Sequence, residues 1–475
     1  MEENASKANT QEPHNVLGNK FDPLLVDGHI IKPPLIYFDN KITVETKDGN
    51  INCMGTKPFS KIKELNKVDI YLLNLKKEAG ELIWNKLINA SKELGITFKE
   101  KPIFYPLDAI KDPYEFEKYI SDYFNKLDDY YKDKEKNATD FIFMLMDYSY
   151  KNKFYYRIFK FVMNKYNWLI PTQVILYDKK KIDNVNLSPF TNILCQMWAK
   201  KGNELYICDF NFVPNTMVVA YSSIEVKRNK VLTSISVSYG TKLYEYMFHS
   251  EIIENPYGNM KISPSIKTLL SKALITIGKH DKKNIENIII YRDAVNDKQM
   301  KYVQQYEISF IKEAIKNVNK ELKELEKKEK IQKIIFEETK WCLILVSKLN
   351  EVKMFLDKSD GVGNNINQMG NIPVGTIVDR VITSNDKYDF YLNSAESKQG
   401  TCSSTHYTVL YDDTKLDAFR IYKLTYYLTY LSYNTTRSIK VPAPLYFVTR
   451  RNKFTVENLK GEIINEKCRV LNISL

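Results

Sequence analysis

Apolar residues in the first half of the chain alternate between short continuous runs and longer stretches with a helical repeat. The short runs predict buried strands and cover residues 68–75, 141–148 and 172–178. The longer stretches predict amphipathic helices and cover residues 81–95, 153–166 and 190–202. Strands that alternate with such helices favour a parallel sheet with both faces covered, so we predict an α/β domain here.

The pattern changes after residue 203. Three apolar runs at hairpin spacing predict an antiparallel meander over residues 204–212, 216–224 and 232–240. A helix at 263–280 and a buried strand at 287–293 follow, which is how a mixed-sheet, nuclease-like domain begins. Further strands are predicted at 341–347, 376–382, 389–394 and 406–412, with one long helix at 416–434. The charged run at 316–333 predicts a helix with a solvated face, and we assign it no chemistry.

The chain therefore divides into three parts. Residues 1–65 are polar and loop-like and form a tail and linker, in which Pro33 and Pro34 pin an extended apolar segment. Residues 66–202 form the first α/β domain, and residues 203–475 form the second.

The amino-acid composition indicates a class of binding partner and a cellular compartment. The 475 residues carry 70 Lys and Arg against 58 Asp and Glu, a net charge of +12 that suits a polyanionic partner and serves solubility equally well. The six cysteines show no CxxC spacing, which favours a reducing compartment, cytoplasmic or nuclear. The N-terminus has no apolar core of a signal peptide, and no apolar run approaches the ~18 residues of a membrane span, so we expect no membrane partner.

Two aspartates end apolar strands. If Asp209 and Asp293 close neighbouring strands of one sheet, their carboxylates converge at one edge, where hard cations such as Mg²⁺ are held for phosphodiester chemistry. The alternative is that each aspartate only closes its strand in a turn, which is the commoner role.

A second group of polar residues has the chemistry of a phosphate pocket. Tyr156 and Lys160 share one helical face, as do Gln196 and Lys200, and Gln173 begins the strand between them. A tyrosine ring can stack on a base while lysines and amides hold a terminal phosphate. Two ordinary amphipathic helices with solvated polar faces remain the alternative.

Several long motifs in the second half resemble the PIWI domain of Argonaute proteins, and the PIWI clade in particular. They are IIIYRDAVNDKQ (288–299), NIPVGTIVDRVIT (371–383), DFYLNSAESKQGTCSSTHYTVLYDD (389–413) and LTYYLTYLSYNTTRSIKVPAPLYF (424–447). The segment before them resembles the family's MID domain, and KPPLIYF resembles the linker that enters it. The resemblance covers about residues 30–475, and implies a Rossmann-like MID domain followed by a ribonuclease H-like PIWI domain. The family's N-terminal and PAZ domains are expected to be absent.

The resemblance assigns the phosphate pocket. Tyr156, Lys160, Gln173, Gln196 and Lys200 match the family's pocket for the 5′ nucleotide of a guide strand, and glutamine at position 196 is the PIWI-type variant. The match needs one extra residue after Lys160, which leaves Tyr155 as an alternative to Tyr156. In PIWI-type pockets Mg²⁺ and the chain's C-terminal carboxylate, here that of Leu475, can join the phosphate.

The resemblance also implies a four-residue nuclease site, of which half is substituted. Asp209 and Asp293 match the two aspartates, whereas Lys261 and Thr449 occupy the positions of the family's glutamate and histidine. An ammonium group repels Mg²⁺, and threonine has neither the charge nor the pKa of a ligand or proton shuttle. We therefore expect cleavage to be lost or very weak.

Two further groups of residues bear on this site. Glu251 or Glu254 could supply the missing acid. His406 matches a family histidine that we interpret as structural or guide-contacting.

The implied function is that of a PIWI-type protein that binds the 5′-phosphorylated end of a small, piRNA-like guide RNA and pairs it with a complementary target RNA. Silencing would then act through recruited effectors that the sequence does not identify. The alternative is a guide-directed endoribonuclease with Mg²⁺ and a non-standard ligand. A third interpretation is a scaffold that binds no guide because it lacks a PAZ domain.

Overall fold

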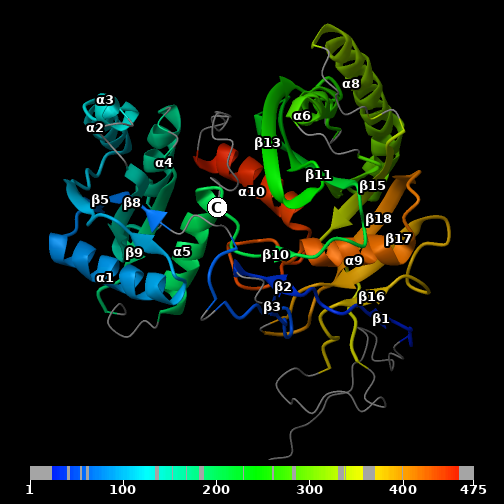
Figure 1. The fold of residues 1–475 in the computed structure, drawn as a ribbon, viewed down its shortest axis with the longest axis horizontal. Helices are drawn as coiled ribbons and strands as arrows, with labels where there is room; N and C mark the ends of the chain where they lie inside the picture. The colour runs from blue at the N-terminus through cyan, green and yellow to red at the C-terminus, as the bar shows by residue number, and fades with distance from the viewer. Residues whose placement is uncertain are drawn as a thin grey trace, which may run out of the picture.

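The computed structural model describes residues 24–458, except 40–42, 54–55, 60–63, 134–138, 152, 167, 169, 181–186, 228, 259–261, 281–284, 330–335, 337, 357–369 and 398. Two α/β units lie side by side and are drawn in blue to teal and in green to red in Figure 1.

The first unit is a four-stranded parallel sheet with the order β7-β5-β8-β9. Its strands are β5 (Lys67–Leu73), β7 (Ile103–Leu107), β8 (Thr139–Asp147) and β9 (Thr172–Tyr177). The central strands β5 and β8 are buried almost throughout, because helices cover both faces. This arrangement confirms the predicted parallel α/β domain.

The covering helices are sorted by face. The apolar sides of α1 (Lys77–Glu93) and α5 (Ser188–Lys200) share one core with β5 and β8. The opposite face holds a core rich in aromatic rings beneath α2 (Pro113–Asn125), α3 (Asp128–Lys132) and α4 (Tyr155–Lys165). The proline at the start of α2 and the Asp112 side chain, which accepts from the Tyr114 and Glu115 amides, fix where that helix begins.

The second unit is a nine-stranded mixed sheet with the order β1-β16-β17-β18-β15-β14-β11-β12-β13. Its strands are β1 (His29–Ile30), β11 (Thr216–Lys227), β12 (Lys230–Tyr239), β13 (Lys242–Glu254), β14 (Asn287–Asp293), β15 (Lys340–Ser347), β16 (Thr376–Val378), β17 (Tyr388–Asn393) and β18 (Thr405–Asp412). An antiparallel meander, β11 to β13, leads into the parallel strands β14 and β15 beside β11. The predicted mixed-sheet domain is confirmed.

Helices cover both faces of this sheet as well. Side chains of β11 alternate, so Val219 and Tyr221 enter the core beneath α6 (Ile266–His280) and α8 (Ile308–Glu329). Val218 and Ala220 enter the other core, beneath α9 (Ala418–Leu428) and α10 (Ala443–Asn458). A short helix, α7 (Asp297–Tyr302), and a π-helical turn, Val303–Glu307, lead into α8.

One sequence prediction about the meander was wrong. Residues 204–212 were expected to form its first strand, but only β10 (Ile207–Cys208) is extended there, and it pairs with β2 (Ile36–Tyr37) in a separate sheet with β3 (Thr43–Val44). The true third strand is β13, whose mixed polar and apolar pattern gave no clear strand signal. The two-residue strands β4 (Glu64–Leu65) and β6 (Thr97–Phe98) form a further small ladder.

The linker lies strapped along the second unit, as expected. Its strand β1 extends the large sheet at β16, and β2 holds β10. No helix in the described part of the chain combines the length and apolar character that crossing a membrane requires.

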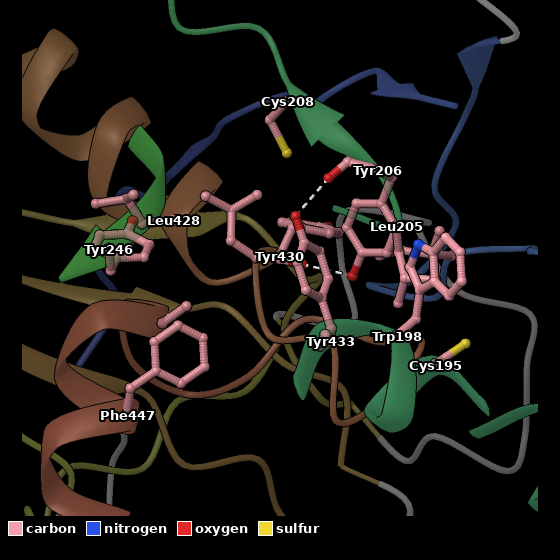
Figure 2. Packing of buried hydrophobic residues seen from close by; sticks show 14 of the residues in the cluster. Cys195, Trp198, Leu205, Tyr206, Cys208, Tyr246, Leu428, Tyr430, Tyr433 and Phe447 are labelled. Atoms are coloured by element: carbon pink, nitrogen blue, oxygen red, sulfur yellow. Dashed lines mark hydrogen bonds between the residues drawn. The ribbon is translucent and has the colours of Figure 1, made fainter. Parts of the chain in front are cut away.

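A buried aromatic cluster joins the two units (Figure 2). Trp198, from the last turn of α5, lies beside Tyr206, whose hydroxyl donates to the Tyr430 carbonyl at 2.8 Å. In return, the Tyr433 hydroxyl donates to the Tyr206 carbonyl at 2.7 Å, and the two rings meet edge to face. These directional bonds inside an apolar cluster fix how the end of the first unit sits on the second.

The contact between linker and sheet leads to a prediction on stability. Gly375 has φ +96°, and a Cβ there would lie 2.5 Å from the Ile31 carbonyl oxygen, which is backbone and cannot turn away. We expect Gly375→Ala to lower the free energy of unfolding by about 2 kcal/mol or more, through the strained φ and the clash together.

The matched control is Gly400→Ala. Gly400 also has a positive φ, +71°, but a Cβ added there would meet no atom within 4 Å. Its cost should be about 1 kcal/mol, from the φ term alone. Urea unfolding measures both variants, and equal losses would show that the linker contact does not contribute.

Candidate functional site

The structure brings the five predicted pocket residues together at the start of β9. Tyr156 and Lys160 come from α4, Gln173 from β9, and Gln196 and Lys200 from α5. The helices α4 and α5 cover opposite faces of the sheet, and a lysine from each reaches Thr172 at the amino-terminal end of β9.

Both lysines converge on one peptide group. The Lys160 ammonium donates to the Thr172 hydroxyl at 2.6 Å and to the Thr172 carbonyl at 3.0 Å. The Lys200 ammonium donates to the same carbonyl at 3.1 Å and also to the Gln173 side-chain oxygen. Lys160 and Lys200 are 7% and 2% exposed, so the two positive charges are buried together.

Burial sets the electrostatics of this pair. It lowers the pKa of Lys160 to about 7. It also lowers the pKa of Lys200 well below its usual range, and the charges of Lys160 and Arg450 lower it further. Neither ammonium forms an ion pair with a carboxylate in the described ranges. An anion bound between them would supply the missing counter-charge and favour their protonated forms.

The two glutamines extend the pocket toward the second unit. The Gln173 amide donates to the Gln196 side-chain oxygen at 3.2 Å, and the Gln196 amide donates to the Asn434 carbonyl at 3.4 Å. Gln196 therefore links the pocket to the segment between α9 and α10.

Tyr156, and not its neighbour Tyr155, belongs to the pocket. The Lys160 ammonium lies 6.0 Å from the centre of the Tyr156 ring. Tyr155 is 1% exposed and meets Phe116 edge to face in the aromatic core, so it has no free face for a ligand.

Sequence reasoning missed one cation whose charge acts on the pocket residues, Arg450. Burial raises the pKa of Tyr156 and the positive charge of Arg450 opposes that rise, as it also lowers the pKa of Lys200. Arg450 lies on α10, about 250 residues along the chain from Lys200, and only the fold brings it near. The Arg450–Arg451 pair, just after the motif at 424–447, was the available signal.

The predicted pairing of Asp209 with Asp293 was wrong. Asp209 follows β10, which belongs to the small sheet with β2 and β3, whereas Asp293 ends β14 in the nine-stranded sheet. The Asp209 carboxylate accepts the Asn211 amide at 2.8 Å, the turn-closing role that was the alternative interpretation.

The residue that faces Asp293 is Ser222. Strand β11 runs parallel to β14 with Tyr221 opposite Arg292, which places Ser222 level with Asp293. The Ser222 hydroxyl donates to the Asp293 carboxylate at 3.0 Å. Burial raises the pKa of Asp293, although Arg292 and this hydrogen bond partly offset the rise. The central strand thus offers a hydroxyl where metal-assisted chemistry needs a second carboxylate.

A buried ion pair between Arg292 and Glu307 lies next to Asp293. The Arg292 guanidinium donates to both oxygens of Glu307 at 2.7 and 3.0 Å and to the Asp293 carbonyl at 2.6 Å. The Tyr221 hydroxyl and the Ser263 amide also donate to Glu307. Because Glu307 is saturated by these donors, it is a structural anchor and not a metal ligand.

The structure does not place a carboxylate from the other predicted nuclease positions beside Asp293 in the described residues. Lys261 lies outside the described residues. Thr449, on α10, donates to the Tyr446 carbonyl of its own helix. Glu251 and Glu254 lie on β13, separated from β14 by β11 and β12, so the structure does not place them beside Asp293.

The donor sets do not fit Mg²⁺ at either place. Among the described residues no three His, Cys, Asp or Glu side chains gather closely enough to hold a metal ion. The pocket presents ammonium and amide groups, and the expected carboxylate of Leu475 lies outside the described residues.

His406 makes contacts that connect two strands of the large sheet. Its Nε2 lies 2.6 Å from an Asp389 carboxylate oxygen, and its ring stacks on Tyr391 at 4.3 Å. These contacts join β17 to β18 at some distance in the sheet from β14.

These features define a class of protein: an α/β domain with a buried cationic pocket, joined to a mixed-sheet, nuclease-like domain in whose described residues no three acidic or metal-binding side chains gather. Comparison with family models gives the family. The Piwi domain model matches residues 140–460, more than half of the chain, and the chain belongs to the Piwi family.

Individual relatives agree with this assignment. Piwi-like protein Ago3 of Bombyx mori is 30% identical over 281 residues, which is 58% of this chain and 27% of the relative. The C-terminal lobe of a budding yeast Argonaute has a TM-score of 0.76 and 19% identity, with 95% of each chain covered. The Argonaute of Kluyveromyces polysporus, solved with a guide RNA, has a TM-score of 0.75 and 19% identity, covering 95% of this chain and 57% of that one.

These likenesses confirm the predicted fold class, a Rossmann-like domain followed by a ribonuclease H-like domain. The matched stretch spans about a quarter of the length of the curated relatives.

The buried lysine leads to a prediction on stability and pH. The pKa of Lys160 is about 7 in the folded chain and about 10.4 when unfolded, so between these values protonation favours unfolding. Stability of the ligand-free protein should therefore rise as the pH increases from 7 toward 10. Lys160→Met should remove the part of this dependence that Lys160 contributes, leaving the part that Lys200 contributes, and should raise the free energy of unfolding at pH 7 by a few kcal/mol.

Urea unfolding at pH 7 and pH 9.5, without nucleic acid, measures this effect. The control is Lys165→Met on the exposed side of the same helix, which should change stability by less than about 0.5 kcal/mol. A Lys160→Met protein that is less stable than wild type at pH 7 would refute the argument.

Proposed function

We propose that this protein binds the 5′-phosphorylated end of a small guide RNA and presents the guide for pairing with a complementary target RNA. The observation that carries the proposal is the pair of buried ammonium groups, Lys160 and Lys200, on one carbonyl without a carboxylate partner in the described chain. A phosphate monoester supplies two negative charges and several acceptor oxygens, which suits this donor set. Membership of the Piwi family and the fold shared with an Argonaute solved with a guide RNA support it.

The pocket residues have distinct roles in this proposal. Lys160, Lys200 and Arg450 supply charge, and Gln173 and Gln196 supply amide donors once their mutual bond is exchanged for a phosphate oxygen. The half-buried Tyr156 ring offers an aromatic face for the first base. Because the protein contacts backbone and terminus, sequence choice rests on base pairing.

We further propose that the complex does not cut its target. Two-metal phosphodiester cleavage needs converging carboxylates. In the described part of the second domain, Asp293 is instead satisfied by the Ser222 hydroxyl, and Asp209 lies in another sheet. Silencing would then depend on recruited effector proteins.

The pocket predicts a strong preference for a 5′ phosphate. With a 21-nucleotide RNA labelled at its 3′ end, fluorescence anisotropy should show tighter binding of the 5′-phosphate form than of the 5′-hydroxyl form. Lys160→Ala or Lys200→Ala should each weaken binding of the phosphate form about 10- to 100-fold, because each removes a charge-assisted contact in a buried site.

Lys165→Ala, on the exposed side of the same helix, is the matched control and should leave both affinities unchanged. Equal binding of the two RNA forms by the wild type would contradict the proposal. It would favour the scaffold interpretation, in which no guide is bound.

The substituted nuclease site predicts no cleavage. A guide-loaded preparation mixed with a matched, end-labelled target and Mg²⁺ or Mn²⁺ should give no discrete product, and Asp293→Ala should bind target as the wild type does. A single cut opposite the middle of the guide that disappears in Asp293→Ala would establish the endoribonuclease alternative.

A further inference from the structure

On the long helix α8, most of the lysines lie on one face. Its buried side consists of Ile311, Ala314, Ile315, Val318 and Leu322, which pack on the core of the second unit beneath α6. The helix carries nearly as many glutamates as lysines, so its net charge is not informative. The lysines, however, recur at the spacing of a single helical face. We call this set the lysine stripe, and its members are Lys312, Lys316, Lys320, Lys323 and Lys327.

The stripe is long, straight and accessible. From Lys312 to Lys327 it runs about 22 Å at 1.5 Å per residue, with neighbouring charges about 5–6 Å apart. Four of the five side chains are exposed, and Lys323 is half-buried. Within the described part of the chain, Lys312, Lys316 and Lys320 form no ion pair, whereas Glu313, on the flank of the stripe, is held by Lys267 at 2.5 Å.

A groove follows the stripe. Its volume is about 480 Å³, with lysine side chains along one wall and Ile315, Phe336 and Trp341 at its base. At one end Lys312 lies 4.7 Å from the centre of the Tyr411 ring, which stacks on Trp341 at 4.1 Å. The wall of the groove is therefore positive along its whole length.

The stripe is remote from the phosphate pocket. The pocket lies between α4 and α5 in the first unit, and α8 lies on the far side of the second unit (Figure 1). A ligand on the stripe is therefore a separate contact from the one that holds the guide's terminus.

We propose that the lysine stripe binds the sugar-phosphate backbone of a single-stranded RNA segment without sequence preference. A row of evenly spaced cations matches a linear polyanion with one charge per nucleotide, and the aromatic rings of Phe336 and Trp341 line the groove beside it. In a guide-target complex this segment would be target RNA beyond the paired region. The backbone contact itself does not require the proposed guide-binding function.

The test uses the full chain and a 20-nucleotide polyuridine RNA whose 5′ end is blocked by fluorescein, so that it cannot enter the phosphate pocket. The stripe variant is K312Q/K316Q/K320Q/K323Q. Its affinity at 50 mM salt should fall at least 10-fold. The slope of log affinity against log salt should become shallower by about 0.7 for each lost phosphate contact, about 2–3 in total.

Two matched variants make the result specific. K92Q/K101Q/K111Q/K118Q removes the same four charges from exposed positions of the first unit and should change affinity less than threefold. K312R/K316R/K320R/K323R keeps the charges and should bind as the wild type does. If the stripe variant binds within threefold of the first-unit variant, net charge explains the binding and the proposal fails. If the stripe variant binds as tightly as the wild type, RNA is not the occupant and the proposal also fails.

Discussion

Two ammonium groups share one buried peptide carbonyl, and the first domain is organised around that arrangement. Lys160 and Lys200 come from different helices, and both reach Thr172 at the start of β9. Burying two like charges without a carboxylate is unfavourable, so the surrounding fold must hold them in place. The parallel sheet and its two apolar cores provide that stability, and no carboxylate of the described chain forms an ion pair with either lysine.

In the second domain, by contrast, the buried charges have partners within the protein. A ribonuclease H-like centre with several carboxylates depends on bound cations to offset their repulsion. Here the Asp293 carboxylate accepts from the Ser222 hydroxyl, and Arg292 donates to the backbone carbonyl of Asp293. Behind it, Arg292 and Glu307 balance each other while fully buried. The charges of this region in the described chain are therefore held by contacts within the protein itself.

The sequence predicted the pocket well and the nuclease site poorly, for physical reasons. Tyr156 with Lys160, and Gln196 with Lys200, are one helical turn apart, and local periodicity reports such neighbours directly. Asp209 was misassigned because its apolar run looks like a strand, while the real central strand carries serine where a carboxylate was sought. Arg450 and the lysine stripe could not be predicted from local sequence. Arg450 comes from a helix far along the chain from the pocket, and the stripe can be recognised only once the buried face of α8 is known.

Helix α10 makes the two sites neighbours in one rigid element. Its Arg450 acts on Tyr156 and Lys200 in the pocket. One turn or less further on, Arg451 donates to Ser250 at 3.0 Å, and Asn452 donates to the Ser222 carbonyl at 2.8 Å. Gln196 adds a second connection through Asn434, just before α10. One helix therefore carries both a cation near the pocket and the side chain that holds the strand facing Asp293.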